Sequence, residues 1–252
     1  SRKAYDDEIG KLSDTLNYMA EEITKRDQLK NEFISSVSHE LRTPLTSIKG
    51  WAMTLNTADI SDDETLKDGL RIIEKESDRL TAMVEELLDF SKFASGKMTI
   101  KKRKASLAKV IDYVKSHMSP LAQRNKIDFN VEYEDDLPII EIDEDRMKQV
   151  FINILDNAFK FTGQGGRVTF TAKTEGKSII ISIEDNGCGI SREDLPKVKE
   201  KFYKGKNSKS QNGIGLSICD EIIKMHNGTF IIDSILNEGT KVTIALPLSV
   251  NG

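Results

Sequence analysis

The sequence predicts an α+β protein, in which a long helical hairpin precedes a two-layer α/β sandwich with a largely antiparallel sheet. In residues 6–93, apolar side chains recur at spacings of three and four, with one proline and three glycines. This periodicity is typical of amphipathic helices. From about residue 97 onward, helical segments are followed by pairs of adjacent strand-like segments. That order favours an α+β sandwich over the regular βαβ alternation of a doubly wound fold.

The composition restricts the class of protein. The chain has 252 residues, of which 38% are hydrophobic and 31% charged, and its formal net charge is -4. Nucleic-acid binders usually carry a basic excess, so no nucleic-acid partner is expected. The basic run at 101–104 is only weak evidence for such a partner, because the chain as a whole is acidic. The two cysteines, Cys188 and Cys219, form no Cys-x-x-Cys pair. A reducing, cytoplasmic setting without structural zinc or disulfides is therefore expected.

The N-terminal third contains three apolar stripes. The first has coiled-coil spacing and consists of Ile9, Leu12, Leu16, Met19 and Ile23. The second consists of Ile34, Val37, Leu41, Leu45, Ile48, Ala52 and Leu55. The third, after a predicted turn at 57–63, includes Leu66, Leu70, Ile73, Leu80, Val84 and Leu87, and Gly96 is expected to end its helix. The short connection predicts an antiparallel hairpin.

Two helices alone cannot enclose this much apolar surface. We therefore predict a homodimer whose two hairpins form a four-helix bundle. The alternative is that the hairpin packs against the rest of the same chain.

His39 lies away from the second stripe. At about 100° per residue, it is about 160° from Leu41 round the helix. Its own face carries small or polar side chains: Ser35, Thr43, Thr46 and Gly50. Glu40 follows directly and could orient the imidazole or take its proton. Pro44 costs a helix interior about 3 kcal/mol, and its presence here suggests a functional bend.

The second part of the chain should contain six strands and three helices. The expected strands are 98–102, 126–133, 167–173, 178–184, 229–234 and 240–246. The expected helices are 106–124, 144–160 with Asp143 as its N-cap, and 213–226. No P-loop, dinucleotide-binding glycine fingerprint or His-Arg-Asp kinase loop is present.

Three polar groups in these segments could bind a nucleotide. Asn153, Asn157 and Lys160 share one helix face, and oxygen donors suit Mg²⁺ and its waters, although a solvated face is the alternative. Asp185 ends an apolar strand and could accept a hydrogen bond from an exocyclic amine, although an ordinary turn is the alternative. Residues 197–209 carry six lysines and one acidic residue, and they lead into a glycine-rich helix start that favours phosphate.

The segment from Ser38 to Leu45 resembles the phospho-acceptor box of bacterial sensor histidine kinases. The resemblance implies that His39 takes the γ-phosphoryl group of ATP on a ring nitrogen. It implies that Glu40 acts as base or orienter, and that Thr43 positions water for phosphatase activity on the partner.

The later segments resemble the ATP-binding domain of histidine kinases, whose fold is shared with gyrase, Hsp90 and MutL ATPases. This resemblance implies Mg²⁺ binding at Asn157, phosphate or metal-water contacts at Asn153 and Lys160, and recognition of the adenine amine by Asp185. The other ATP-binding residues that it implies are Gly187, Gly189, Tyr203, Lys204, Gly213, Gly215 and Thr240. Four positions depart from the family pattern: Cys188, Lys204, Gln211 and Asn237.

The resemblance to histidine kinases covers about residues 30–248. The segment from Asp7 to Gly10, with the coiled-coil stripe that follows it, resembles the second helix of a HAMP signal-relay module. Together these resemblances imply three domains. These are a HAMP-derived or signalling coiled-coil helix at 1–28, a dimerisation and histidine phosphotransfer domain at 29–95, and an ATP-binding catalytic domain at 96–250. They also imply phosphotransfer from His39 to an Asp of a response-regulator receiver domain, and a parent receptor anchored in the bacterial inner or plasma membrane by segments outside this sequence.

Two alternative functions remain open. An ATPase of the same fold would hydrolyse ATP, but those relatives place a glutamate base four residues before the metal-binding asparagine. That position is Asn153 here, and an amide cannot activate water. The second alternative is a phosphatase-biased dimeric scaffold, which Thr43 leaves open.

Overall fold

The computed structural model describes residues 3–57, 63–94, 97–200, 203 and 214–248. The chain forms two compact units, residues 1–87 and residues 88–252. We call them the helical unit and the sheet unit and describe each by itself.

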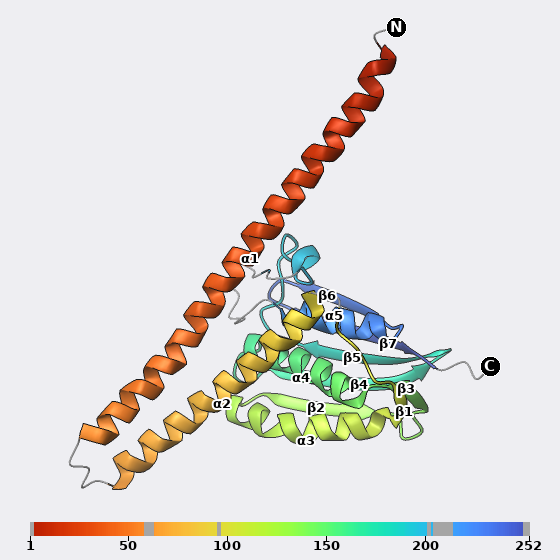
Figure 1. The fold of residues 1–252 in the computed structure, drawn as a ribbon. Coiled ribbons are helices and arrows are strands. Elements are labelled where there is room, and N and C mark those ends of the chain that lie inside the picture. The colour runs from red at the N-terminus through yellow and green to blue at the C-terminus, as the bar shows by residue number, and fades with distance from the viewer. Residues whose placement is uncertain (1–2, 58–62, 95–96, 201–202, 204–213, 249–252) are drawn as a thin grey trace. The chain divides into compact units, whose positions relative to one another are not determined.

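The helical unit is built from α1, Lys3–Thr57, and most of α2, Asp63–Ala94 (Figure 1). The first two predicted stripes lie on the single helix α1, which continues through Pro44. The predicted turn centre and Gly96 lie outside the described residues. Asp63 and Glu64 in the first turn of α2 complement the helix dipole.

Gly69 brings the two helices of the hairpin close together. A β-carbon at this position would lie 2.8 Å from Trp51 Cε3 and 3.0 Å from Leu55 Cδ2. About half of the stripe residues, in contrast, stay exposed in the single chain. The large exposed members are Leu12, Leu16, Met19, Ile23, Ile34, Leu45, Leu66, Leu70 and Val84. This surface agrees with the predicted need for a partner.

The sheet unit is a two-layer sandwich. Its elements are β1 (Arg103–Ser106), α3 (Leu107–Asn125), β2 (Asp128–Tyr133), β3 (Ile139–Ile142), α4 (Glu144–Phe161), β4 (Arg167–Glu175), β5 (Ser178–Asp185), a 3-10 turn (Leu195–Lys197), α5 (Gly215–Met225), β6 (Thr229–Ile235) and β7 (Gly239–Pro247). The main sheet has the order β2-β4-β5-β7-β6. Only the β2–β4 pair in it is parallel, so the predicted fold class and largely antiparallel sheet are confirmed.

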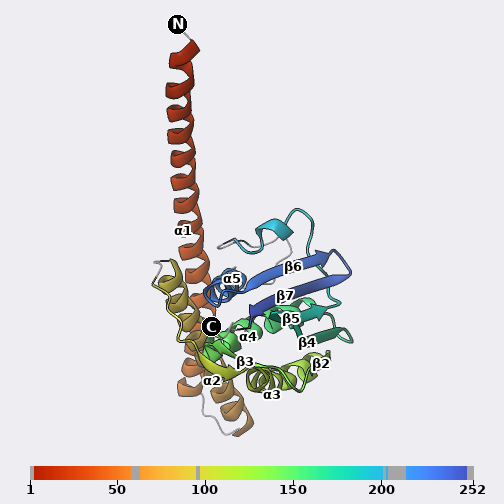
Figure 2. The ribbon, with the colours of Figure 1, turned by 90° about the vertical axis from the view of Figure 1, so that its right-hand side faces the viewer.

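The helices α3, α4 and α5 cover one face of the sheet (Figure 2). The core lies between these helices and the inward side chains of the strands. Phe151 on α4 meets Phe170 on β4 edge to face, with ring centroids 5.3 Å apart. His226, at the end of α5, is buried and accepts a hydrogen bond from the Asp143 N–H at 2.9 Å. This bond ties the end of α5 to the start of α4.

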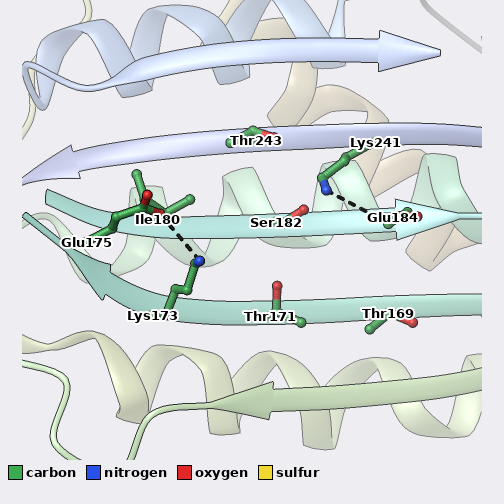
Figure 3. A pocket seen from close by; sticks show the side chains of 9 residues that line it. All are labelled: Thr169, Thr171, Lys173, Glu175, Ile180, Ser182, Glu184, Lys241 and Thr243. Carbon is green, nitrogen blue, oxygen red and sulfur yellow. Dashed lines mark ion pairs between the residues drawn. The ribbon is translucent and has the colours of Figure 1, made fainter.

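The other face of the sheet is polar and hollowed (Figure 3). Its lining includes Thr169, Thr171, Ser182 and Thr243, with the Ile180 side chain beside them. Two ion pairs occupy it, Lys173–Glu175 and Lys241–Glu184, each at 3.4 Å. Side chains alternate between the faces along a strand, so this face is distinct from the one that packs against the helices.

The prediction of a strand at 98–102 is wrong. Residues 97–102 are irregular, and the strand β1 follows at Arg103–Ser106. The Lys101 N–H donates to the Asp143 carboxylate at 2.7 Å, so a helix-capping residue, not a strand, holds this segment. The strand β3, which pairs only with β1, was not predicted. The remaining predicted elements lie within two residues of the observed bounds, and Asp143 caps α4 by accepting from the Arg146 N–H.

Candidate functional site

Asp185 ends β5 and begins a tight loop. The Gly187 N–H donates to Asp185 Oδ1 at 2.9 Å, and the Cys188 N–H donates to the Phe161 carbonyl at the end of α4 at 3.1 Å. A β-carbon at Gly187 would lie 2.4 Å from the Phe161 oxygen. Gly189 has φ +63°, and a β-carbon there would lie 2.0 Å from the Ile235 oxygen. Both glycines are required by backbone that approaches from two sides.

The Asp185 carboxyl is half-buried in this loop. Burial raises its pKa, and hydrogen bonds from the backbone N–H groups of Gly187 and Thr240 oppose that increase. A carboxylate in such a place is a strong acceptor for a ligand that donates a hydrogen.

The pairing of three strands places Asp185 in a cross-strand row. Asp185 on β5 is opposite Thr240 on β7, and Thr240 is opposite Ser234 on β6. Paired residues point to the same face of a sheet. The next row, Glu184 and Lys241, lines the polar face in Figure 3. Asp185 and Thr240 therefore face the helix side, where α4 lies.

The helix α4 presents Asn153 and Asn157 as half-buried side chains. Asn153 lies beside the start of α5, because a β-carbon at Gly215 would be 3.8 Å from its Nδ2. The buried Cys219 thiol on α5 donates to the Val150 carbonyl on α4 at 3.8 Å, and burial raises the pKa of this thiol to about 12. The thiol is thus a packing group and not a nucleophile. The fold brings together the helix with the two asparagines, the Asp185 loop and the start of α5.

Two family models match the chain. Residues 29–96 match the His Kinase A (phospho-acceptor) domain, and residues 142–250 match the histidine kinase-, DNA gyrase B- and HSP90-like ATPase family. The chain belongs to the histidine kinases. Together the two matches cover more than half of the sequence, in the order expected from the motifs.

Similar proteins agree with this assignment. The chain is 36% identical to the sensor histidine kinase YclK of Bacillus subtilis over 98% of its own length and 54% of that protein. It is thus about half as long as this relative. Among solved structures it is similar to histidine kinase ThkA in complex with response regulator protein TrrA, at 27% identity and TM-score 0.65, covering 90% of this chain and 64% of that one. It is also similar to full-length ShkA in complex with AMPPNP, at 26% identity and TM-score 0.65, covering 88% and 46%.

The predicted phospho-acceptor residues of this histidine kinase lie on α1. His39 and Thr43 are exposed, and Glu40 between them is half-buried. The Thr43 hydroxyl donates to the His39 carbonyl at 3.4 Å. Pro44 is buried within the uninterrupted helix. These residues belong to the helical unit, whereas the predicted nucleotide-binding residues belong to the sheet unit.

Lys160 and Tyr203 have partners within the protein. The Lys160 ammonium is 2.6 Å from Asp156 Oδ2. The Tyr203 hydroxyl donates to Asp194 Oδ1 at 2.6 Å, and this bond raises the pKa of Tyr203 to about 12. Lys204 and Gly213 lie outside the described residues, as does the departure at Gln211.

Two groups of polar residues next to the site were not predicted. Ser234 contacts Thr240 across the β6–β7 pair. Asp89, near the end of α2, accepts hydrogen bonds from Arg146 and Gln149 on α4. Neither set is a sequence motif, and only strand register and helix packing bring their members together.

Across the described helices, none is both long and apolar enough to cross a membrane.

Proposed function

We propose that this chain transfers the γ-phosphoryl group of ATP to a ring nitrogen of His39, and then to an Asp carboxylate of a response-regulator receiver domain. One observation carries the proposal: an exposed histidine followed by a glutamate occurs in the same chain as a half-buried carboxylate at a glycine loop suited to adenine. AMPPNP, with which ShkA was solved, is an ATP analogue, and this supports ATP as the nucleotide.

ATP would bind between α4 and the Asp185 loop. The Asp185 carboxylate would accept from the exocyclic amine of adenine, and the Asn153 and Asn157 amide groups would face the phosphates. Mg²⁺, with Asn157 as a ligand, would neutralise phosphate charge when bound, and the amide oxygens fit its preference for oxygen donors. A contact of Lys160 with phosphate would compete with its ion pair to Asp156.

The chemical step requires His39 as a neutral nucleophile. Its free ring nitrogen attacks the γ-phosphorus, the bond to the β-γ bridging oxygen breaks, and ADP leaves. The proton on the other ring nitrogen passes to Glu40, so that the phosphorylated imidazole ring carries no positive charge. Positioning and charge neutralisation supply most of the catalysis in phosphoryl transfer.

Hydrolysis is disfavoured as the main reaction. Asn153 occupies the position four residues before Asn157, and an amide cannot remove a proton from water. A phosphatase-biased scaffold is the second candidate, because Thr43 is exposed one turn after His39 and could position water toward a phosphorylated partner.

The partners follow from the same proposal. ThkA was solved with a response regulator protein, which supports a receiver domain as the acceptor. The exposed stripes of the helical unit support a homodimer. Because YclK is a sensor kinase about twice as long, we infer that this chain is the cytoplasmic portion of a membrane-anchored bacterial receptor. No nucleic-acid partner is proposed.

The test is incubation with γ-labelled ATP and Mg²⁺, in which the chain is compared with His39→Gln. We expect label on the unmodified chain alone, lost in acid and kept in alkali, as a phosphohistidine behaves. ATP binding without label would favour the phosphatase-biased scaffold. Acid-stable label on both proteins would contradict the assignment of His39 and indicate a hydroxyl acceptor.

A further inference from the structure

Ser234 is the meeting point of three hydrogen bonds next to the Asp185 loop. Its hydroxyl oxygen receives the Ile190 N–H at 2.8 Å, lies 2.7 Å from the Gly239 carbonyl and lies 3.0 Å from Thr240 Oγ1. Ile190 belongs to the loop that begins at Asp185, whereas Gly239 and Thr240 begin β7. One side chain on β6 therefore joins the two segments that carry the predicted adenine-binding residues.

The direction of these bonds follows from counting hydrogens. A serine hydroxyl has one hydrogen and two lone pairs. The Gly239 carbonyl can only accept, so the hydrogen of Ser234 points to it. The Ile190 N–H can only donate and takes one lone pair of Ser234. The second lone pair is left for Thr240, whose hydroxyl must then donate to Ser234.

The consequence is that Thr240 presents only acceptors to a ligand. Its hydroxyl hydrogen is used by Ser234, and its remaining lone pairs lie in the same row as the Asp185 carboxylate. Both groups can accept hydrogen bonds, and neither can donate one. Two acceptors side by side favour a base whose exocyclic amine donates to them over a base that carries an oxo group at the same position.

We propose that Ser234 is a positioning residue for nucleotide selectivity, which acts by orienting the Thr240 hydroxyl as an acceptor beside Asp185. This inference rests on the proposed function, because it takes the Asp185 loop as the adenine site. Ser234 itself does not contact the nucleotide in this proposal.

The same residue also has a structural effect. Without its hydroxyl, the Ile190 N–H and the Gly239 carbonyl would lose their partner. The loop keeps other links, because the Asn237 N–H donates to the Cys188 carbonyl at 2.8 Å. Loosening the loop should weaken the binding of all nucleotides alike, whereas reorienting the Thr240 hydroxyl should change the ratio of their affinities. The ratio of two affinities therefore separates the two effects.

The experiment compares ATP with inosine triphosphate, which has an oxo group in place of the amine. Binding of each to the full chain with Mg²⁺ is measured by calorimetry, so that no phosphorylation is needed. In Ser234→Ala the Thr240 hydroxyl is free to donate. We expect the preference for ATP to fall roughly fivefold, which is the contribution of about one neutral hydrogen bond. Ser234→Thr, which keeps a hydroxyl, should retain the preference.

A double-mutant comparison tests whether Ser234 acts through Thr240. In a Thr240→Val background, Ser234→Ala should leave the affinity ratio unchanged, because no hydroxyl remains to be oriented. If Ser234→Ala weakens both nucleotides equally in the unmodified background, Ser234 is only structural and the inference is wrong. If the unmodified chain binds neither nucleotide, the proposed function fails and this inference fails with it.

Discussion

Burial raises the pKa of Asp185, so the fold holds this carboxyl where its ionised form is disfavoured. A group whose pKa is raised by folding supports the folded state while it is protonated. That support is lost as the pH rises through the folded-state pKa. At neutral pH, Asp185 therefore works against stability, and we interpret this as the consequence of its role as an acceptor for the nucleotide.

Asp185→Asn should separate stability from binding. The neutral amide keeps an oxygen for the Gly187 N–H and removes the buried charge, so the free energy of unfolding at pH 7.5 should be equal to or higher than in the unmodified chain. ATP affinity should fall at least tenfold, because a charge-assisted hydrogen bond is lost. Urea denaturation followed by circular dichroism, together with calorimetry, measures both quantities.

The neighbouring residue provides the control for this prediction. Glu184 lies on the opposite face of the sheet, and its 3.4 Å ion pair with Lys241 is exposed. Glu184→Gln should therefore leave ATP affinity unchanged. A similar loss of ATP affinity in both variants would contradict a specific role of the Asp185 carboxylate in binding.

At the scale of elements, periodicity predicted the long helices and the central strands, because each buries a regular face. The strand β1 was misplaced and β3 was missed for a common reason. Each has four residues, and each pairs only with the other among the described strands, at positions 33 to 39 residues apart along the chain. A signal of that length is weak by itself, and the partner is visible only after folding. The passage of α1 through Pro44 goes against local propensity, but the apolar stripe from Ile34 to Leu55 predicted it.

The last turns of α2 are joined to α4 by a small polar network within the sheet unit. Asp89 Oδ2 accepts from Arg146 Nη1 at 2.7 Å and from Gln149 Nε2 at 2.8 Å. Arg146 Nη1 also donates to Gln149 Oε1 at 2.8 Å. Burial alone would raise the pKa of Asp89, but the hydrogen bonds from Arg146 and Gln149 outweigh it, and the net pKa is lowered.

Asp89→Ala should reduce the free energy of unfolding by about 1–3 kcal/mol at neutral pH, because the half-buried Arg146 charge loses its partner. A lowered pKa contributes stability above the unfolded value of 3.8, and that contribution is lost as the pH falls through the folded-state pKa. The difference between the two chains should therefore be constant from about pH 7 to 5 and shrink below about pH 4. Urea denaturation across this range measures it.

A matched variant exists on the surface of the same unit. Asp128 and Arg167 form an ion pair of 3.1 Å whose side chains are 54% and 67% exposed. Asp128→Ala should cost less than about 1 kcal/mol, because exposed pairs are screened by solvent. If both variants lose the same stability, the network at α2 has no special role.

For the whole molecule, the order of the motifs predicted which residues share a site better than their spacing did. Asn153 and Gly215 are brought together only by the packing of α5 on α4, and that packing could be anticipated only from the family resemblance. The Ser234–Thr240 contact depends on strand register, and Ser234 belongs to none of the motifs that resemble the family. The sequence therefore did not predict the polar residues that support the Asp185 loop, and the ligand contacts expected of the other residues stay predictions.

The helical unit as a single chain leaves Leu45 54% exposed and Leu70 53% exposed, and burying such side chains is the main driving force for association. We expect the unmodified chain to have twice the single-chain mass of 28.3 kDa in light scattering at micromolar concentration. Leu70→Glu should shift it toward the mass of one chain, because a charge would be placed in the bundle. Ile139→Glu changes a side chain that is 66% exposed on β3 of the sheet unit and should leave the dimer intact. A single-chain mass for the unmodified protein, or equal dissociation of both variants, would contradict a dimer formed by the helical hairpins.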